Sequence, residues 1–336
     1  MPRRVEVPLS PVVDTTVQHG DWRDNLFKHG FVVVKDVMSP ERAAYYVDRM
    51  FQWLETFPYG FDRNDRSTWN PEHLPRHMKG GMYHDYGAPH EDFVWEARSE
   101  PGVIDAFAKL WGTDELLVSF DGINFTLPTP TPALSQPWPH IDQSPKRKGL
   151  VCAQGIINFA PNGPEDGGLV VLRGSHNLTE EFFQKHPETS GKRTWGTEDY
   201  WSFSTEEVEW FKEAGCEVVK VCADPGDLII WDSRTIHYNK LPESQQVRSI
   251  VYACYAPAQF ATENDLKLKR LLFHGRRGTT HWPNMNIFPG GLPGKLRLGK
   301  PDTCSRDRPL NDVQETVKVL HLAGAKPYRA EESIVE

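Results

Sequence analysis

The chain has 336 residues, of which 38% are hydrophobic and 25% charged, and its formal net charge is -8 at pH 7. This composition is typical of a globular protein, and a chain of this length can bury a large core. The negative charge argues against a nucleic-acid-binding surface, and no window approaches the apolar length of a membrane span. We therefore expect a small-molecule substrate as the partner, with neither nucleic acid nor membrane, and the sequence leaves the oligomeric state open.

The cysteines indicate a reducing environment. Their number is odd and no two of them form a C-x-x-C pair, so neither a disulfide framework nor a thiolate zinc site is predicted. The N-terminus lacks the apolar region of a secretory signal peptide. We therefore expect free thiols and a cytoplasmic location. The five cysteines are Cys152, Cys216, Cys222, Cys254 and Cys304.

The first third of the chain predicts a strand, helices and a long irregular segment. The β-branched run 31–34 favours a strand, and Ser39 with Pro40 supplies an N-cap and a first-turn proline for an amphipathic helix through Trp53. Residues 58–92 show neither helical nor strand periodicity, and such a long loop in a compact domain is usually functional. We therefore expect it to form part of a substrate pocket.

The next part of the chain becomes β-rich. Residues 91–111 predict helix interrupted at Pro101, and residues 115–127 predict a strand pair or one bent strand. Short strands punctuated by Gly and Pro turns favour a sandwich or jelly-roll barrel. The predicted strand runs are 150–159, 168–172, 217–221, 227–231 and 247–255.

Helices are predicted around this β region. Ser204 with Glu207, and Thr262 with Asp265, have the spacing of capping boxes, and a last amphipathic helix is predicted over 310–322. We expect a single domain over residues 1–336, made of an N-terminal part with the pocket loop (20–127), a β core (128–257) and C-terminal helices and loop (258–336).

Two metal-competent side chains stand in H-x-D spacing at His140 and Asp142. On an extended strand this spacing places both on one face. His237 follows the predicted strand 227–231 and is the best candidate for a third ligand. Two His and one carboxylate form the facial triad of non-haem Fe(II) oxygenases, with open positions for a cosubstrate and O2. Arg248 on the next strand would bind the far carboxylate of 2-oxoglutarate.

Other interpretations stand beside this one. An isolated H-x-D pair is weak evidence, and a second copy occurs at His90-Glu91-Asp92, where a helical pattern would separate the two side chains. A non-catalytic metal- or ligand-binding β-barrel would not need His237 and Arg248 together. A metal-dependent hydrolase would explain the triad but gives Arg248 no role.

The chain resembles the phytanoyl-CoA dioxygenase-like family of Fe(II)/2-oxoglutarate-dependent oxygenases over about residues 29–257. The likeness is carried by the opening stretch 30–40, by His140-Ile141-Asp142 and by the glycine-rich strand 167–176, in which Arg173 stands where proline is usual. Pro225-Gly226-Asp227 followed by His237 and Arg248 resembles the distal half.

The resemblance implies a mainly β fold with flanking helices and a double-stranded β-helix core, the jelly-roll or cupin-like barrel. It implies Fe(II), 2-oxoglutarate and O2 as cofactor and cosubstrates, and oxidation of a substrate with release of succinate and CO2. Hydroxylation is the default reaction, and desaturation, epoxidation and ring formation are the alternatives. Asn239 would assist Arg248 in holding 2-oxoglutarate, and Gln154 would lie near the cosubstrate. His176 is expected to be structural. Asn239 could instead be a turn residue after its strand, and Gln154 could be a polar strand residue that faces outward.

The substrate is predicted only by class. The irregular segments 58–92, 187–203 and 276–292 combine cations and aromatics suited to a small carboxylic or specialised metabolite. Candidate substrate-binding residues are Arg276, Arg277, His281 and Trp282. Arg276 and Arg277 could instead be an exposed pair that follows a helix and does not bind substrate.

Overall fold

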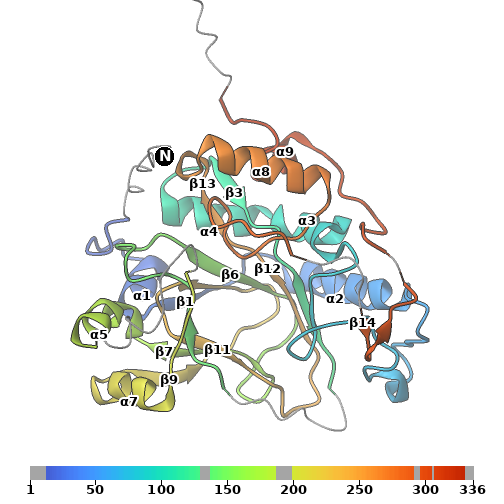
Figure 1. Ribbon diagram of the computed structural model, residues 1–336, viewed down its shortest axis with the longest axis horizontal. Coiled ribbons are helices and arrows are strands. Elements are labelled where there is room, and N and C mark those ends of the chain that lie inside the picture. Colours follow the sequence, from blue (N-terminus) through green and yellow to red (C-terminus); the bar gives the residue numbers. More distant parts are fainter. Residues whose placement is uncertain (1–12, 129–136, 187–198, 291–295, 305, 330–336) are drawn as a thin grey trace, which may run out of the picture.

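Two antiparallel sheets form the centre of the computed structural model, which describes residues 13–128, 137–186, 199–290, 296–304 and 306–329 (Figure 1). The larger sheet has the strand order β1-β10-β6-β12-β4-β2 and the smaller one β8-β5-β11-β7-β9. The strands of the larger sheet are β1 (Phe31–Val34), β2 (Met82–Tyr83), β4 (Ile123–Thr126), β6 (Ala153–Asn158), β10 (Leu228–Asp232) and β12 (Arg248–Tyr252). Those of the smaller sheet are β5 (His140–Ile141), β7 (Gly168–Arg173), β8 (Trp201–Ser202), β9 (Glu217–Lys220) and β11 (His237–Lys240). These two sheets make the predicted jelly-roll core.

The two-residue alternation of each strand divides its side chains between two apolar layers. On β10, Leu228 and Ile230 belong to the large core under the helices, whereas Ile229 and Trp231 belong to the core between the sheets. Because neighbouring side chains of a strand point to opposite faces, a continuous apolar run predicts this burial on both sides. A strand such as β10 therefore holds the barrel to its helical cover.

Helices cover the outer faces of both sheets. Figure 1 shows α2, α3, α4 and α8 on one side of the molecule and α5 and α7 beside the smaller sheet. The outer layer against the smaller sheet packs Leu172 of β7 against Phe182 and Phe211. The helices are α1 (Trp22–His29), α2 (Pro40–Glu55), α3 (Asp92–Arg98), α4 (Pro101–Trp111), α5 (Thr179–Lys185), α7 (Thr205–Glu213), α8 (Glu263–His274) and α9 (Val317–Leu322). Two short pairs complete the fold, β3 (Leu116–Val118) with β13 (Tyr255–Pro257) and β14 (Leu296–Arg297) with β15 (Lys300–Pro301).

The helix starts follow the local sequence signals. The Ser39 side chain accepts a hydrogen bond from the Arg42 N–H at the start of α2. Both predicted capping boxes form, Ser204 with Glu207 before α7 and Thr262 with Asp265 before α8. These caps confirm the predicted helix starts because they satisfy first-turn N–H groups that have no partner inside the helix.

The prediction of a last helix over 310–322 is wrong in its first half. The helix begins only after Thr316, whose side chain caps Val319 N–H. Before it, the Glu91 carboxylate accepts hydrogen bonds from the backbone N–H groups of Leu310 (2.8 Å) and Asn311 (3.0 Å). The Asn311 carbonyl oxygen also accepts a 2.8 Å hydrogen bond from the Asp92 N–H, so it does not serve as the acceptor of a helical hydrogen bond. No helix in the described part of the chain has the length and apolar character needed to cross a membrane.

Candidate metal centre and cosubstrate pocket

Three side chains that can bind a metal meet inside the barrel. His140 lies on β5, Asp142 follows it directly, and His237 opens β11, whose antiparallel register pairs His237 with His140. One ligand atom from each residue lies within 4.8 Å of the other two. The Nε2 atom of His237 is 3.2 Å, and that of His140 3.8 Å, from the same carboxylate oxygen of Asp142. The structure thus brings together the three residues that the sequence singled out.

Both imidazole rings are oriented by backbone carbonyl groups two residues earlier. The Nδ1 atom of His140 lies 2.9 Å from the carbonyl oxygen of Trp138, and that of His237 lies 2.9 Å from the carbonyl oxygen of Thr235. With Nδ1–H as the donor, the lone pair of each ring is on Nε2. Second-shell hydrogen bonds of this kind fix the tautomer of a metal-binding histidine.

Burial shapes the protonation of this cluster. Burial first, and then the neighbouring His237, lower the pKa of His140 to about 4. Burial alone would raise the pKa of Asp142, but His140, His281 and His237 together hold that pKa below its ordinary value. The centre therefore presents a carboxylate and a neutral His140 imidazole, which are the protonation states that metal binding requires.

Gln154 holds the carboxylate of Asp142. From β6, its side-chain amide donates a 2.9 Å hydrogen bond to Asp142 Oδ2, and the Asp142 N–H donates to the carbonyl oxygen of Ser233. Gln154 also lines the cavity beside the three ligand residues. The sequence predicted Gln154 near a cosubstrate, and the structure adds a contact with a ligand side chain that the sequence did not indicate.

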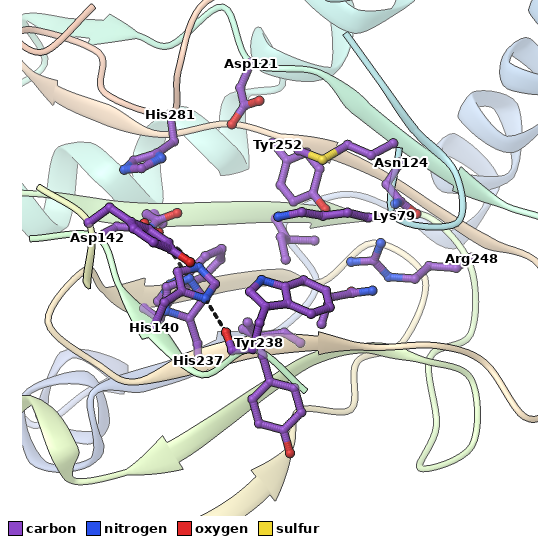
Figure 2. A pocket seen from close by; sticks show the side chains of 18 residues that line it. Lys79, Asp121, Asn124, His140, Asp142, His237, Tyr238, Arg248, Tyr252 and His281 are labelled. Atoms are coloured by element: carbon purple, nitrogen blue, oxygen red, sulfur yellow. Dashed lines mark hydrogen bonds and ion pairs between the residues drawn. The ribbon is translucent and has the colours of Figure 1, made fainter. Parts of the chain in front are cut away.

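The same cavity contains a buried cation that forms no ion pair with an acidic side chain in the described part of the chain. Arg248, at the start of β12, is 4% exposed, and its Nη1 atom has no hydrogen-bond partner among the described residues. Figure 2 shows Arg248 on one side of the cavity and His140, Asp142 and His237 on the other. An unpaired buried charge is costly, so this guanidinium fits an anion that enters the cavity. The far carboxylate of 2-oxoglutarate is such an anion.

Small and polar residues pack around Arg248. A Cβ atom on Gly168, which has φ +97°, would lie 3.0 Å from Arg248 Nε. Lys220 donates a 2.8 Å hydrogen bond to Asn162, and burial together with Arg248 lowers the pKa of Lys220 to about 8. Asn239, two residues after His237, lines the cavity as well. This end of the cavity is thus rich in positive charge and hydrogen-bonding groups.

Of the four candidate substrate-binding residues, one lines the cavity. His281 does so, and its Nε2 atom is buried without a hydrogen-bond partner among the described residues. Arg276 is instead bound to Asp312 (2.5 Å) and Glu315 (2.7 Å), so its charge is already paired. Arg277 is directed to the Gly290 carbonyl oxygen, and Trp282 packs with Val151 and Cys152. The structure does not bring these last three residues to the cavity.

No sequence motif predicted several other residues of the cavity wall. Lys79 and Met82 come from the irregular segment 58–92, as the predicted pocket loop requires. Of segment 187–203, residues 187–198 lie outside the described part of the chain. The remaining wall includes the carboxylate of Asp121. In the sequence, Asp121 stands out only as an acidic residue within a predicted apolar strand pair. Further wall residues are Asn124, Trp138, Ile156, Leu169, Tyr200, Trp231, Tyr238 and Tyr252.

The competing histidines have structural contacts. The Nε2 atom of His176 lies 3.0 Å from the Phe27 carbonyl oxygen, and His176 does not line the cavity. In the second H-x-D copy, His90 is fully buried beside Trp95 and Asp92 opens α3. Both therefore belong to the packing of the fold, as the sequence predicted for His176.

Known proteins resemble the chain in both sequence and fold. The family model described as phytanoyl-CoA dioxygenase (PhyH) matches residues 26–250. The "Ava biosynthesis cluster protein O" of Aspergillus versicolor is 45% identical over 283 residues, which cover 84% of this chain and 90% of that protein.

Solved structures share the fold at low sequence identity. GIG2 (DUF1479) from Candida albicans has a TM-score of 0.62 at 13% identity, covering 96% of this chain and 80% of that one. EctD from S. alaskensis, in a structure with bound Fe, has a TM-score of 0.51 at 14% identity, covering 76% and 84%. The extent of the family match, together with the near relative, shows that the chain belongs to the phytanoyl-CoA dioxygenase (PhyH) family and is a non-haem iron, 2-oxoglutarate-dependent oxygenase.

Proposed function

We propose that His140, Asp142 and His237 hold Fe(II), and that Arg248, assisted by Asn239, binds the far carboxylate of 2-oxoglutarate. The reaction we propose is the hydroxylation of a small metabolite: R–H, 2-oxoglutarate and O2 give R–OH, succinate and CO2. The observation that carries this proposal is that one cavity is lined by a two-histidine, one-carboxylate cluster and by a buried arginine whose Nη1 has no hydrogen-bond partner among the described residues.

The donor set fits iron and leaves room for its partners. Two imidazole nitrogens and one carboxylate oxygen form the facial triad that non-haem Fe(II) oxygenases use. Bound there with 2-oxoglutarate, Fe(II) supplies the O2-dependent oxidation of a C–H bond. Asp142 provides a carboxylate ligand at the position where related halogenases lack one, which disfavours halogenation.

The protein residues orient the reactants and exclude water. The planar Arg248 guanidinium can bind a carboxylate through two parallel hydrogen bonds, which fixes the direction of 2-oxoglutarate as well as its position. Gln154 holds the Asp142 carboxylate at 2.9 Å. Apolar side chains of the wall, namely Ile156, Leu169 and Trp231, limit the access of bulk water to the reacting atoms.

The size of the cavity supports a small substrate. Its volume is about 260 Å³, and 2-oxoglutarate would occupy part of it. Large substrates would have to extend beyond the described walls. Arg276 does not support a carboxylic substrate, because Asp312 and Glu315 already pair with its side chain.

An anaerobic absorption measurement tests the proposed site. Protein mixed with Fe(II) and 2-oxoglutarate without O2 should show a weak visible metal-to-ligand charge-transfer band. The band should be absent in His140→Ala and in Asp142→Ala, and it should persist in His274→Ala, which changes an exposed histidine at the end of α8. A wild-type protein without the band, or variants that keep it, would contradict the proposal.

A further inference from the structure

Asp121 places a second carboxylate in the cavity, apart from the metal-binding cluster. It lies between β3 and β4, is 6% exposed and lines the cavity. Figure 2 shows the Asp121 side chain and His281 on the same side of the cavity. The proposed binding of iron and 2-oxoglutarate gives Asp121 no role.

Among the described residues, one oxygen of this carboxylate has a hydrogen-bond partner and the other has none. Oδ1 accepts a 2.6 Å hydrogen bond from the Gly122 N–H and lies 3.5 Å from His84 Nε2, which is beyond a normal hydrogen-bond length. No hydrogen bond of a described residue reaches Oδ2. The fully buried Arg98 lies close by, but its guanidinium donates to the main-chain carbonyl groups of Pro89 and Asp121. Arg98 therefore leaves Oδ2 unoccupied.

The other cations of the cavity wall are engaged elsewhere. The Lys79 ammonium group lies over the Trp138 ring, 4.8 Å from its centroid, and forms no ion pair with Asp121 within 4.0 Å. Arg248 is assigned to 2-oxoglutarate. Desolvating a carboxylate costs several kcal/mol unless a partner compensates it. Oδ2 of Asp121 is open to the cavity, so a ligand that displaces the water there must itself bring a partner for this oxygen.

We propose that Asp121 determines substrate specificity by binding a protonated nitrogen of the substrate through Oδ2. The substrate is then a small cationic metabolite that carries an ammonium, amidinium or guanidinium group. This inference rests on the proposed function, because it presupposes that iron and 2-oxoglutarate fill the rest of the cavity. Tyr200 on the wall adds an aromatic face, which attracts cations.

His281 supplies a second polar contact for the same ligand. Its Nε2 atom is buried and has no hydrogen-bond partner among the described residues, although it lines the cavity. A hydrogen-bonding group of the substrate next to its cationic nitrogen can pair with His281 Nε2. Asp121 and His281 together would fix the orientation of the substrate, so that one of its C–H bonds faces the metal-binding cluster.

Three probes of similar shape and different charge test this proposal. Wild-type protein and the Asp121→Asn variant, both loaded anaerobically with Fe(II) and 2-oxoglutarate, are titrated calorimetrically at neutral pH with benzylamine, benzyl alcohol and benzoate. The wild type should bind protonated benzylamine at least about tenfold more tightly than either other probe, and Asp121→Asn should lose this preference. Asn keeps the oxygen that accepts from Gly122 N–H, and Asp105→Asn on the exposed face of α4 is the matched control.

The outcomes separate this inference from the proposed function. Failure of the proposed function would appear as a missing charge-transfer band in the wild type. Failure of the Asp121 assignment would appear as an intact band with no preference for the amine, with a preference that survives in Asp121→Asn, or with no amine binding at tens of millimolar. Direct ligation of the amine to iron would also survive in Asp121→Asn. If Asp121→Asn does not fold, titration of the metal-free wild type with the same three probes decides, because the amine cannot then ligate iron and a lost preference would contradict the assignment.

Discussion

His140 and His237 are paired residues of the antiparallel strands β5 and β11, and their ring centroids are 4.3 Å apart. They lie 97 positions apart in the sequence (237 minus 140). The register of one strand pair thus brings both imidazoles to the same point of the barrel. Asp142 completes the cluster because it follows His140 by two residues on extended backbone, so that its side chain returns to the same face.

Gln154→Leu should weaken Fe(II) binding about 10- to 100-fold without unfolding the protein, because the Asp142 carboxylate loses its amide donor. Fe(II) titration of the apoprotein measures this effect. Gln184→Leu on the exposed face of α5 is the control and should bind Fe(II) as the wild type does. Equal affinity in both variants would mean that Gln154 does not orient the ligand.

Arg248→Gln should raise KM for 2-oxoglutarate by about 100-fold or more, since truncation of a buried charged partner costs about 3 kcal/mol. Fe(II) affinity should stay near the wild-type value, because Arg248 is not one of the three residues of the metal-binding cluster. Arg270→Gln, an exposed position on α8, should change neither quantity. A normal KM in Arg248→Gln would contradict the assignment.

Gly168→Ala should impair 2-oxoglutarate binding in addition to stability. Gly168 and Gly112 both have positive φ, so Ala at either position should lower the free energy of unfolding by about 1 kcal/mol. Only at Gly168 would the new Cβ meet Arg248 Nε, whereas at Gly112 nothing lies within 4 Å. The KM for 2-oxoglutarate should therefore rise in Gly168→Ala alone, and a rise of similar size in both variants would oppose this reasoning.

Lys220 should make stability depend on pH above about pH 8. Burial lowers its pKa from 10.5 to about 8, so between these values the unfolded chain binds more protons than the folded one. The free energy of unfolding should then rise with pH in this window, by about 2 kcal/mol after allowance for solvent screening. Denaturant unfolding of wild type and Lys220→Met at several pH values measures this. A difference between the two proteins that stays constant from pH 7 to 10 would contradict it.

Local patterns predicted the parts of the site and fold that depend on short-range geometry. The H-x-D spacing indicated that His140 and Asp142 share a face because strand side chains alternate strictly. The capping boxes before α7 and α8 formed because they too depend on residues three positions apart. The link to His237 needed a further condition, that two distant strands pair, and the jelly-roll pattern supplied it.

Contacts between distant segments could not be read from such patterns. The sequence could not show that Asp312 and Glu315 pair with Arg276. Nor could it show that the backbone of residues 310 and 311 binds Glu91 and Asp92, so that the last helix begins later. Asp121 went unnoticed for a similar reason. An acidic residue between two strands usually faces solvent, and only the packing around it shows that its carboxylate faces the cavity.

The most direct test of the account is a crystal structure of the anaerobic complex with Fe(II) and 2-oxoglutarate, with anomalous data collected at the iron edge. We expect one strong anomalous peak in contact with Nε2 of His140, Nε2 of His237 and a carboxylate oxygen of Asp142, and the far carboxylate of 2-oxoglutarate on Arg248. An iron peak away from these three side chains, or 2-oxoglutarate bound without Arg248, would contradict the account.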